Sequence, residues 1–177
     1  MKFRDLPLDG ACLIELEPQV DERGFFARSF CVDELADHGK PITIAQENVS
    51  FNRRRGTLRG MHLQREPNGE VKIVRCTRGA IYDVIVDVRA ASPTRARWTG
   101  VELTASNRNA LYVPRGFAHG FLTLEDDTEV AYAMGSRYVP GAGTGYRYDD
   151  PAFAIAWPFA PVVISPRDLA FSPYSTP

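Results

Sequence analysis

The sequence predicts an all-β fold of the sandwich, jelly-roll or barrel type, with only short peripheral helices. Residues 80–88 alternate between an apolar face and a face that carries Asp83 and Asp87 among isoleucines, which is the two-residue period of a β-strand. Nine other short segments resemble strands, and turn signals rich in Gly, Pro and Asp separate them. Many short strands at intervals of roughly 8–12 residues are typical of such folds.

The expected strands run from near the N-terminus to the last third of the chain. They cover residues 11–17, 25–30, 42–49, 57–64, 70–76, 80–88, 97–103, 110–113, 119–123 and 128–134. A helix is expected over residues 32–39, where Gly39 is suited to end it. A second helical turn is expected after Ser165, which is a good N-cap residue. The tail after Trp157 should wrap around the barrel.

The composition indicates one soluble globular domain over residues 1–177. The chain has 177 residues and a net charge of −1, so no general basic field draws it to nucleic acid or to an anionic membrane. Neither a signal peptide nor a run of about 18 apolar residues is evident, so no membrane span is expected. The odd, widely spaced set of Cys12, Cys31 and Cys76 is not a disulfide framework. These residues are expected to be small buried thiols in a cytoplasmic protein.

Polar side chains interrupt several of the predicted strands. Arg59 and His62 flank Gly60, and on a regular strand they would face opposite sides unless a bulge turned both inward. Lys72 lies among apolar residues on the face that should hold Val74. The strands at 119–123 and 128–134 contribute a further histidine and tyrosine.

Each of these residues also has a purely structural interpretation. A lysine extends to a strand edge, a histidine is hydrogen-bonded, and a tyrosine fills the core. Asp83 and Asp87 are expected to fix turns or to pair with arginines. Together, however, the basic and aromatic side chains would line a cationic pocket suited to a phosphorylated ligand. The glycine-rich string at 141–146 has no βαβ context, so we interpret it as a flexible surface loop and not as a phosphate-binding loop.

The chain resembles the dTDP-4-dehydrorhamnose 3,5-epimerase family of the cupin superfamily. The resemblance rests on the strings DERGFF (21–26), QENVSFN (46–52), GTLRGMHLQ (56–64), VKIVRCTRGAIYDVIVDVR (71–89) and VPRGFAHGF (113–121). It implies a cupin-type double-stranded β-helix (jelly roll), and usually a homodimer that exchanges N-terminal strands. It also implies epimerisation of a nucleotide-linked 4-keto-6-deoxyhexose at carbon 3, carbon 5 or both, in a pathway like that of dTDP-rhamnose.

The resemblance also assigns roles to particular residues. His62 would be the base with Asp168 as its partner, Tyr132 the acid on the opposite face of the sugar, and Lys72 the cation beside the keto oxygen. Further residues would contact the substrate: Arg23, Phe26, Gln46, Asn48, Arg59, His119, Tyr138 and Arg167. No redox cofactor is expected, because epimerisation involves no net oxidation.

Two positions depart from the family pattern and leave the exact sugar and nucleotide open. Arg28 stands where the family usually has glutamate, and Glu70 where it usually has glutamine. Four alternatives remain. They are a sugar-nucleotide ketoisomerase, an epimerase acting at carbon 3 alone, a non-catalytic sugar-binding barrel and a metal-dependent cupin oxygenase.

A metal site is not expected. The second histidine of the cupin His-x-His pair is missing, because His62 is followed by Leu63 and Gln64. A facial triad made of His62, His119 and one carboxylate is the alternative, but Lys72 in the same pocket would repel a divalent cation.

Overall fold

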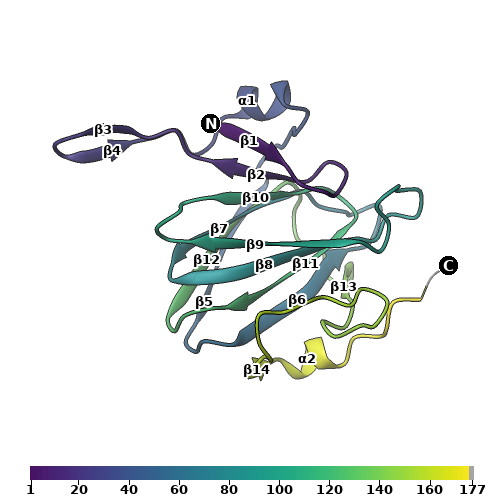
Figure 1. The fold of residues 1–177 in the computed structure, drawn as a ribbon. Helices are drawn as coiled ribbons and strands as arrows, with labels where there is room; N and C mark the ends of the chain where they lie inside the picture. Colours follow the sequence, from purple (N-terminus) through teal and green to yellow (C-terminus); the bar gives the residue numbers. More distant parts are fainter. Residues whose placement is uncertain (176–177) are drawn as a thin grey trace.

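Two six-stranded sheets face each other in the computed structural model, which describes residues 1–175 (Figure 1). In spatial order the first sheet contains β1 (Lys2–Asp5), β2 (Cys12–Glu15), β10 (Ala110–Val113), β7 (Lys72–Arg78), β12 (Thr128–Met134) and β5 (Gln46–Asn52). The second sheet starts with five strands in the order β13 (Gly143–Gly145), β6 (Thr57–Gln64), β11 (Phe117–Thr123), β8 (Ala80–Asp87) and β9 (Trp98–Thr104). Its sixth strand, β14 (Val163–Ile164), pairs with β6. The predicted all-β architecture is therefore confirmed.

Strand β8 shows how the alternation of the sequence builds the interior. Ile81 and Ile85, on the face with the carboxylates, pack in the central core between the sheets. Val84 and Val86, on the fully apolar face, point to the outside of the barrel and belong to a second cluster that includes Trp157. Both faces of β8 are thus covered, which explains why the strand is almost continuously apolar.

Residues that follow β12, among them Tyr146, Phe153 and Trp157, pack in the cluster on that outer face, and Tyr174 of the tail joins them, as expected for a tail that wraps around the barrel. Strand β14 runs parallel to β6, and the short helix α2 (Pro166–Leu169) follows it directly. The glycine-rich segment is not the flexible surface loop that we expected, because β13 pairs antiparallel with β6. Glycines carry no side-chain signal for a strand, so its backbone pairing is invisible in the sequence pattern.

The boundaries of several other elements also differ from the prediction. The strand expected at 42–49 is β5, which begins at Gln46, because Ile42 packs in a loop beneath helix α1 (Val32–Asp37). The strand expected at 25–30 ends at Phe26, and helix α1 ends before Gly39. Cys31 is half-buried at the start of α1, whereas the other two cysteines are buried as expected.

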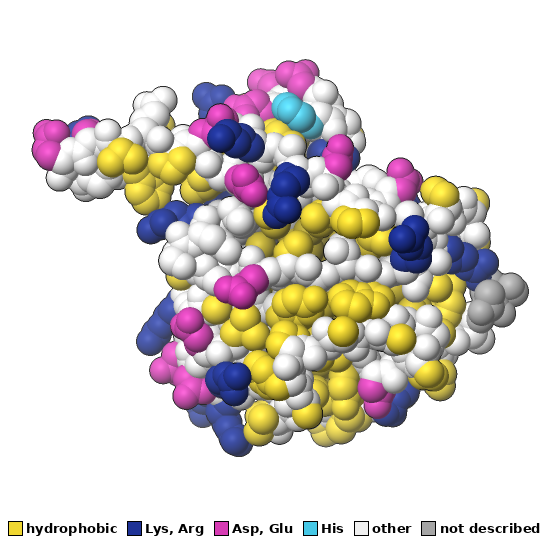
Figure 2. All heavy atoms as spheres, in the orientation of Figure 1, with side chains coloured by type: hydrophobic (Ala, Val, Ile, Leu, Met, Phe, Trp, Pro, Cys, Tyr) yellow, Lys and Arg dark blue, Asp and Glu magenta, His cyan; other side chains and the backbone are white. Residues whose placement is uncertain are grey.

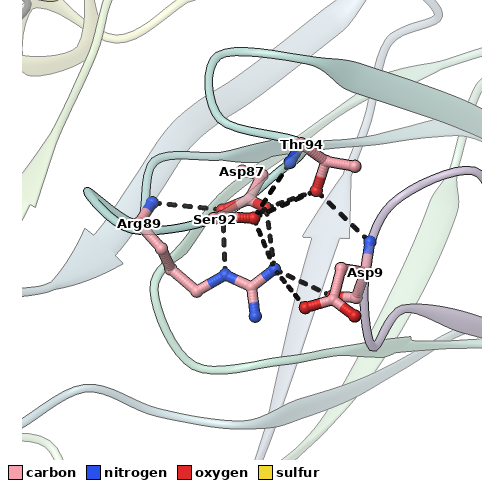
Figure 3. A network of polar contacts seen from close by, with 5 residues as sticks. All are labelled: Asp9, Asp87, Arg89, Ser92 and Thr94. Carbon is pink, nitrogen blue, oxygen red and sulfur yellow. Dashed lines mark hydrogen bonds and ion pairs between the residues drawn. The ribbon is translucent and has the colours of Figure 1, made fainter.

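A polar network closes the turn after β8 (Figure 3). Arg89 donates to Asp87 from Nε and Nη2 at 2.9 and 2.7 Å, and Thr94 donates to Asp87 at 2.6 Å. Burial raises the pKa of the Asp87 carboxyl, but its hydrogen bonds with Arg89, Ser92 and Thr94 outweigh burial and lower that pKa overall. Arg89 also donates to the carbonyl oxygen of Asp9 at 2.9 Å. The predicted role of Asp87 in a turn with an arginine is confirmed.

A two-stranded hairpin leaves the body of the protein. It consists of β3 (Gln19–Asp21) and β4 (Gly24–Phe26), which form a separate two-stranded sheet, and it projects from the first sheet beside α1 (Figure 1). Hydrophobic side chains lie on its surface (Figure 2), and Phe26 is 76 % exposed. Neither helix in residues 1–175 is long and apolar enough to cross a membrane.

Candidate active site

A bulge in β6 turns two polar side chains into the space between the sheets. Two residues of β6, one of them Gly60, oppose Gly120 of β11, so the register shifts by one residue. Gly60 has a φ of +143°, and a Cβ atom there would lie 2.5 Å from the Cα atom of Gly120. Only glycine fits this approach. Because of the bulge, Arg59 and His62 line the same cavity, as the sequence analysis allowed.

That cavity has a volume of about 290 Å³ and opens between the two sheets. Strands of both sheets contribute to its wall. The predicted site residues that line it are Asn48, Arg59, His62, Lys72, His119 and Tyr132. The structure therefore brings together the proposed base, acid and lysine, although they lie on three different strands.

His62 and Asp168 form the dyad that was predicted. His62 Nε2 lies 2.9 Å from Asp168 Oδ1, and the backbone N–H of Gly60 donates to Asp168 Oδ2 at 3.2 Å. Helix α2 fixes the position of Asp168. Ser165 caps the helix by accepting from the Asp168 N–H at 3.1 Å, and Pro166 occupies the first helical position. The His62 side chain is 39 % exposed while that of Asp168 is 5 % exposed, so the imidazole faces the cavity with the carboxylate behind it.

Asp168 is ionised near neutral pH. Burial raises its pKa, but the hydrogen bond and charge of His62, the Gly60 N–H and Ser165 together lower it below the usual value. An ionised carboxylate only accepts hydrogen bonds, so Nε2 of a neutral His62 carries the proton. The lone pair is then on Nδ1, which leaves His62 equipped to act as a base.

Tyr132 extends from β12 in the opposite sheet into the same cavity. Its hydroxyl lies 2.9 Å from Ser50 Oγ, and its ring packs edge-to-face against His119 at a centroid distance of 6.4 Å. Burial raises the pKa of Tyr132 well above its usual value, and the hydrogen bond with Ser50 offsets only part of that effect. The phenol therefore remains protonated near neutral pH and can donate a proton.

Lys72 lies at the start of β7 with only 7 % of its side chain exposed. Its Nζ lies 2.8 Å from Glu70 Oε1, and the Glu70 side chain is also nearly inaccessible, at 9 %. The ammonium does not extend to solvent at a strand edge, which was the structural alternative for this residue. It lies in the wall of the cavity that His62 and Tyr132 share.

A second histidine–aspartate pair lies deeper between the sheets. His119 Nε2 is 2.7 Å from Asp83 Oδ1, and both side chains are buried. The expectation that Asp83 fixes a turn or pairs with an arginine was wrong. The register of β8 and β11 puts Asp83 opposite Phe121, two positions from His119 on the same face, where the imidazole offers the carboxylate a hydrogen bond.

A second cavity of about 200 Å³ adjoins the first, and His62, Asn48 and Met134 line both. The other predicted site residues in its wall are Gln46, Tyr138 and Arg167. Gln46 Oε1 accepts from the backbone N–H of Tyr138 at 2.8 Å, which ties the loop after β12 to the edge strand β5. Ten of the twelve predicted site residues thus lie at or directly behind these two cavities.

The remaining two, Arg23 and Phe26, lie elsewhere. Both belong to the projecting β3–β4 hairpin, and neither lines either cavity. The Arg23 side chain is 83 % exposed, and its ion-pair partner within residues 1–175 is Asp21, two positions away on the same hairpin. Within one chain, therefore, these two residues are not part of the site.

Within residues 1–175, no group of three or more His, Cys, Asp and Glu side chains lies close enough to hold a metal ion. His62 and His119 are register partners on β6 and β11, but each imidazole has its Nε2 directed at a carboxylate of its own. The residues alternatively considered for a facial triad therefore form two separate histidine–aspartate pairs.

Sequence reasoning did not find three of the polar contacts in this site. Ser50 contacts the Tyr132 hydroxyl, Glu70 pairs with Lys72, and Asp83 pairs with His119. Ser50 had a usable signal, because it lies on the same face of β5 as Asn48. The other two contacts depend on packing between residues whose proximity the sequence alone does not define.

Comparison with known proteins agrees with this geometry. The sequence model of dTDP-4-dehydrorhamnose 3,5-epimerase matches residues 5–175. The chain belongs to this family. A dTDP-4-dehydrorhamnose 3,5-epimerase from Methanothermobacter thermautotrophicus is 43 % identical, covering 97 % of this chain and 94 % of that protein. A dTDP-4-dehydrorhamnose 3-epimerase from Streptomyces niveus is 38 % identical, covering 95 % and 81 %.

The solved structures of the family show the same fold. The crystal structure of the Bacillus anthracis dTDP-4-dehydrorhamnose 3,5-epimerase, with TDP and PPi bound, has a TM-score of 0.94 and 38 % sequence identity. The match covers 98 % of this chain and 99 % of that one. The predicted cupin jelly roll is therefore confirmed, and the protein is an epimerase, an enzyme of the isomerase class.

Proposed function

We propose that this epimerase inverts carbon 3, carbon 5 or both in a nucleotide-linked 4-keto-6-deoxyhexose of the dTDP-4-dehydro-6-deoxy-D-glucose type. The observation that carries the proposal is a single cavity lined by His62 from one sheet and by Tyr132 and Lys72 from the other. A base, an acid and a cation around one sugar ring are the groups that an enolate mechanism requires.

The first step is removal of a hydrogen next to the ketone. The ketone at carbon 4 acidifies the hydrogens on carbons 3 and 5, and His62 Nδ1 takes one of them as the general base. The imidazolium that forms is stabilised by Asp168, 2.9 Å from its other nitrogen. The electron pair of the broken C–H bond moves into the ring and leaves negative charge on the keto oxygen.

Lys72 stabilises that negative charge. Fixed donors aimed at a developing oxyanion often give the largest single contribution to catalysis. The Lys72 ammonium lies in the cavity wall and is held by Glu70, so little reorganisation is needed when the enolate forms.

Tyr132 completes the inversion. The proton must return on the face opposite to the one from which it was removed, so a second group is required. The raised pKa of Tyr132 keeps the phenol protonated, and the ring covers its side of the cavity against water. When the phenol donates to the ring carbon, the enolate collapses to the ketone with inverted configuration.

The second cavity suits the diphosphate and nucleoside of the substrate. Arg167 and Tyr138 lie in its wall, and Arg59 lies in the wall of the first cavity. Arginine recognises phosphate oxygens through paired hydrogen bonds. The TDP bound to the B. anthracis relative supports a thymidine diphosphate carrier for the sugar.

Arg23 and Phe26 reach a substrate only in a homodimer in which the hairpin of one protomer covers the site of its partner. The exposed apolar side chains of the hairpin support this arrangement, as does the outer face of β5, where Val49 is 64 % exposed. Three free thiols in the described chain support a cytoplasmic location.

Proton NMR in heavy water tests the function. With dTDP-4-keto-6-deoxyglucose as substrate, the signal at carbon 3, carbon 5 or both should disappear as deuterium is incorporated. The carbons that exchange distinguish a double epimerase from a 3-epimerase like the S. niveus relative. His62→Ala should abolish the exchange, whereas His38→Ala, a control on the histidine beside Phe3, should not. Wild-type protein that exchanges neither hydrogen would contradict the proposal.

A further inference from the structure

The Glu70–Lys72 ion pair is buried beside the cavity that contains His62. Ion pairs on a protein surface contribute little to stability, but a buried ammonium requires a partner. The carboxylate belongs to Glu70, two positions before Lys72, which is the first residue of β7, so one chain segment holds both partners. Glu70 itself lines the second cavity, proposed for the diphosphate and nucleoside, and not the cavity proposed for the sugar ring.

The second oxygen of Glu70 is also fixed. Gln64 Nε2 donates to Glu70 Oε2 at 3.0 Å, and Gln64 Oε1 accepts from the backbone N–H of Val139 at 3.0 Å. The donor and acceptor ends of the amide are thereby assigned, because a carboxylate only accepts and a backbone N–H only donates. A continuous chain of contacts runs from the loop after β12, which carries Tyr138, through Gln64 and Glu70 to Lys72.

The position of a lysine ammonium is set by its partners and not by its stem. The side chain has a flexible four-carbon stem and ends in a compact charge without directional planar geometry. A displacement of about 1 Å at a reacting centre costs on the order of 100-fold in rate. The contacts of Lys72 with Glu70 therefore bear directly on the charge that stabilises the enolate.

From these contacts we infer that Glu70, oriented by Gln64, is a positioning residue that holds the Lys72 ammonium at the keto oxygen. This inference rests on the proposed epimerase function. Glu70 does not touch the reacting atoms. It fixes the point in the cavity wall where positive charge is available when the enolate forms.

Two substitutions at Glu70 separate positioning from simple charge. Glu70→Ala removes the partner and should lower kcat for hydrogen exchange by about 10- to 100-fold. KM should stay within about threefold, because a positioning defect acts on the transition state. Glu70→Gln keeps an oxygen that accepts from the ammonium, so this variant should retain at least about a tenth of the wild-type kcat. Its amide group is a poorer partner than a carboxylate for the Gln64 N–H. The matched control is Glu66→Ala, a glutamate of the same segment that pairs with Arg115 on the surface, and it should leave kcat unchanged.

Either of two outcomes would overturn the inference. One is a Glu70→Ala enzyme with wild-type kcat, and the other is a defect that appears in KM alone. Because Glu70→Ala leaves a buried ammonium unpaired, each variant is first compared with wild type in a thermal unfolding scan. If Glu70→Ala does not fold, a Glu70→Gln enzyme with unchanged kcat and KM supports the inference, and one with a raised KM alone overturns it.

A readout independent of activity distinguishes this inference from the proposed function. In a ¹⁵N NMR spectrum of lysine ammonium groups, the Lys72 signal is assigned by its loss in Lys72→Met. We expect a protected signal in wild type and its loss or a clear shift in Glu70→Ala. An unchanged signal would overturn the positioning role. If wild type fails to exchange sugar hydrogens while the signal still depends on Glu70, the proposed function fails and the positioning of the lysine stands.

Discussion

His62 Nε2 lies 2.9 Å from Asp168 Oδ1, although 106 residues separate the two in the chain. The contact depends on two local structures, the bulge at Gly60 and the short helix α2 that Ser165 caps. Both also hold Asp168, since the Gly60 N–H donates to its carboxylate and Ser165 Oγ accepts from its backbone N–H. The base is therefore oriented by the fold before any substrate binds.

Asp168→Asn should lower kcat by at least about 100-fold, because the amide no longer stabilises the imidazolium. It should also change how stability depends on pH. The folded pKa of Asp168 is lowered, so its ionisation stabilises the fold above the unfolded value of about 3.9 and this contribution is lost as the pH falls through the folded pKa. Urea unfolding from pH 7 to pH 3 should show a difference between wild type and variant that shrinks towards acid. A difference that grows on acidification would contradict the assignment.

Tyr132→Phe should slow inversion by about 100-fold while ring-hydrogen exchange continues. The raised pKa of Tyr132 makes it a donor and not a base at neutral pH, so the variant still forms the enolate but returns the proton poorly on the second face. Product formation and deuterium incorporation are followed in one NMR experiment. Tyr112→Phe is the matched control, since the Tyr112 hydroxyl donates to the carbonyl of Pro41 away from the cavity. Equal loss of both rates in Tyr132→Phe would assign the tyrosine to another step.

Gly60→Ala should destabilise the fold and displace the base. The φ of +143° and the approach of 2.5 Å to Gly120 leave no space for a methyl group, and a strained backbone of this kind costs about 1–3 kcal/mol. The control is Gly141→Ala, where φ is +85° but no atom lies within 4 Å of the added methyl group. Chemical denaturation curves measure the free energy of unfolding of both variants. Equal losses in the two variants would show that backbone strain alone, and not the contact with β11, matters at Gly60.

The sequence predicted most of the barrel, because the alternation of apolar and polar residues indicates which strands are buried on at least one face. Strand β6 has the expected bounds and β8 differs at one end only. Strands that are held by backbone hydrogen bonds, without a buried row of apolar side chains, have no such pattern in the sequence. The Gly143–Gly145 strand lacks informative side chains, and β1 and β3 are short edge strands with mostly exposed residues.

The site was predicted to the extent that its residues carry a motif. His62, Lys72 and Tyr132 line one cavity as expected. The partners that orient them were harder to find. Asp83 contacts His119 because of the register of β8 against β11, and register is set by packing across the barrel, not by local sequence.

Treatment with EDTA should leave the exchange rate unchanged. Both imidazoles between the sheets are directed at carboxylates, His62 at Asp168 and His119 at Asp83, and the Lys72 charge lies in the same cavity wall. A divalent cation would have to displace these contacts and overcome that charge. The measurement is the rate of deuterium incorporation before and after dialysis. Loss of activity that returns with added metal would favour the oxygenase-type site instead.

Two inactive variants should restore activity when they are refolded together. Arg23→Ala damages the hairpin and His62→Ala damages the barrel, and these residues lie in separate parts of one chain. If the hairpin of each protomer covers its partner's site, a mixed dimer has one site with an intact barrel and an intact hairpin. Random pairing of equal amounts then gives about a quarter of the wild-type activity.

The control for this experiment mixes His62→Ala with Lys72→Met. Both of these substitutions damage the same cavity, but each chain still carries the intact residue that the other lacks. Because a barrel is built from one chain, no mixed dimer of this pair contains a complete site, and activity should stay absent. Recovery with Arg23→Ala but not with Lys72→Met would show that the hairpin acts between protomers. Absence of recovery in both mixtures, with dimers confirmed by light scattering, would mean that Arg23 has no role at the partner's site.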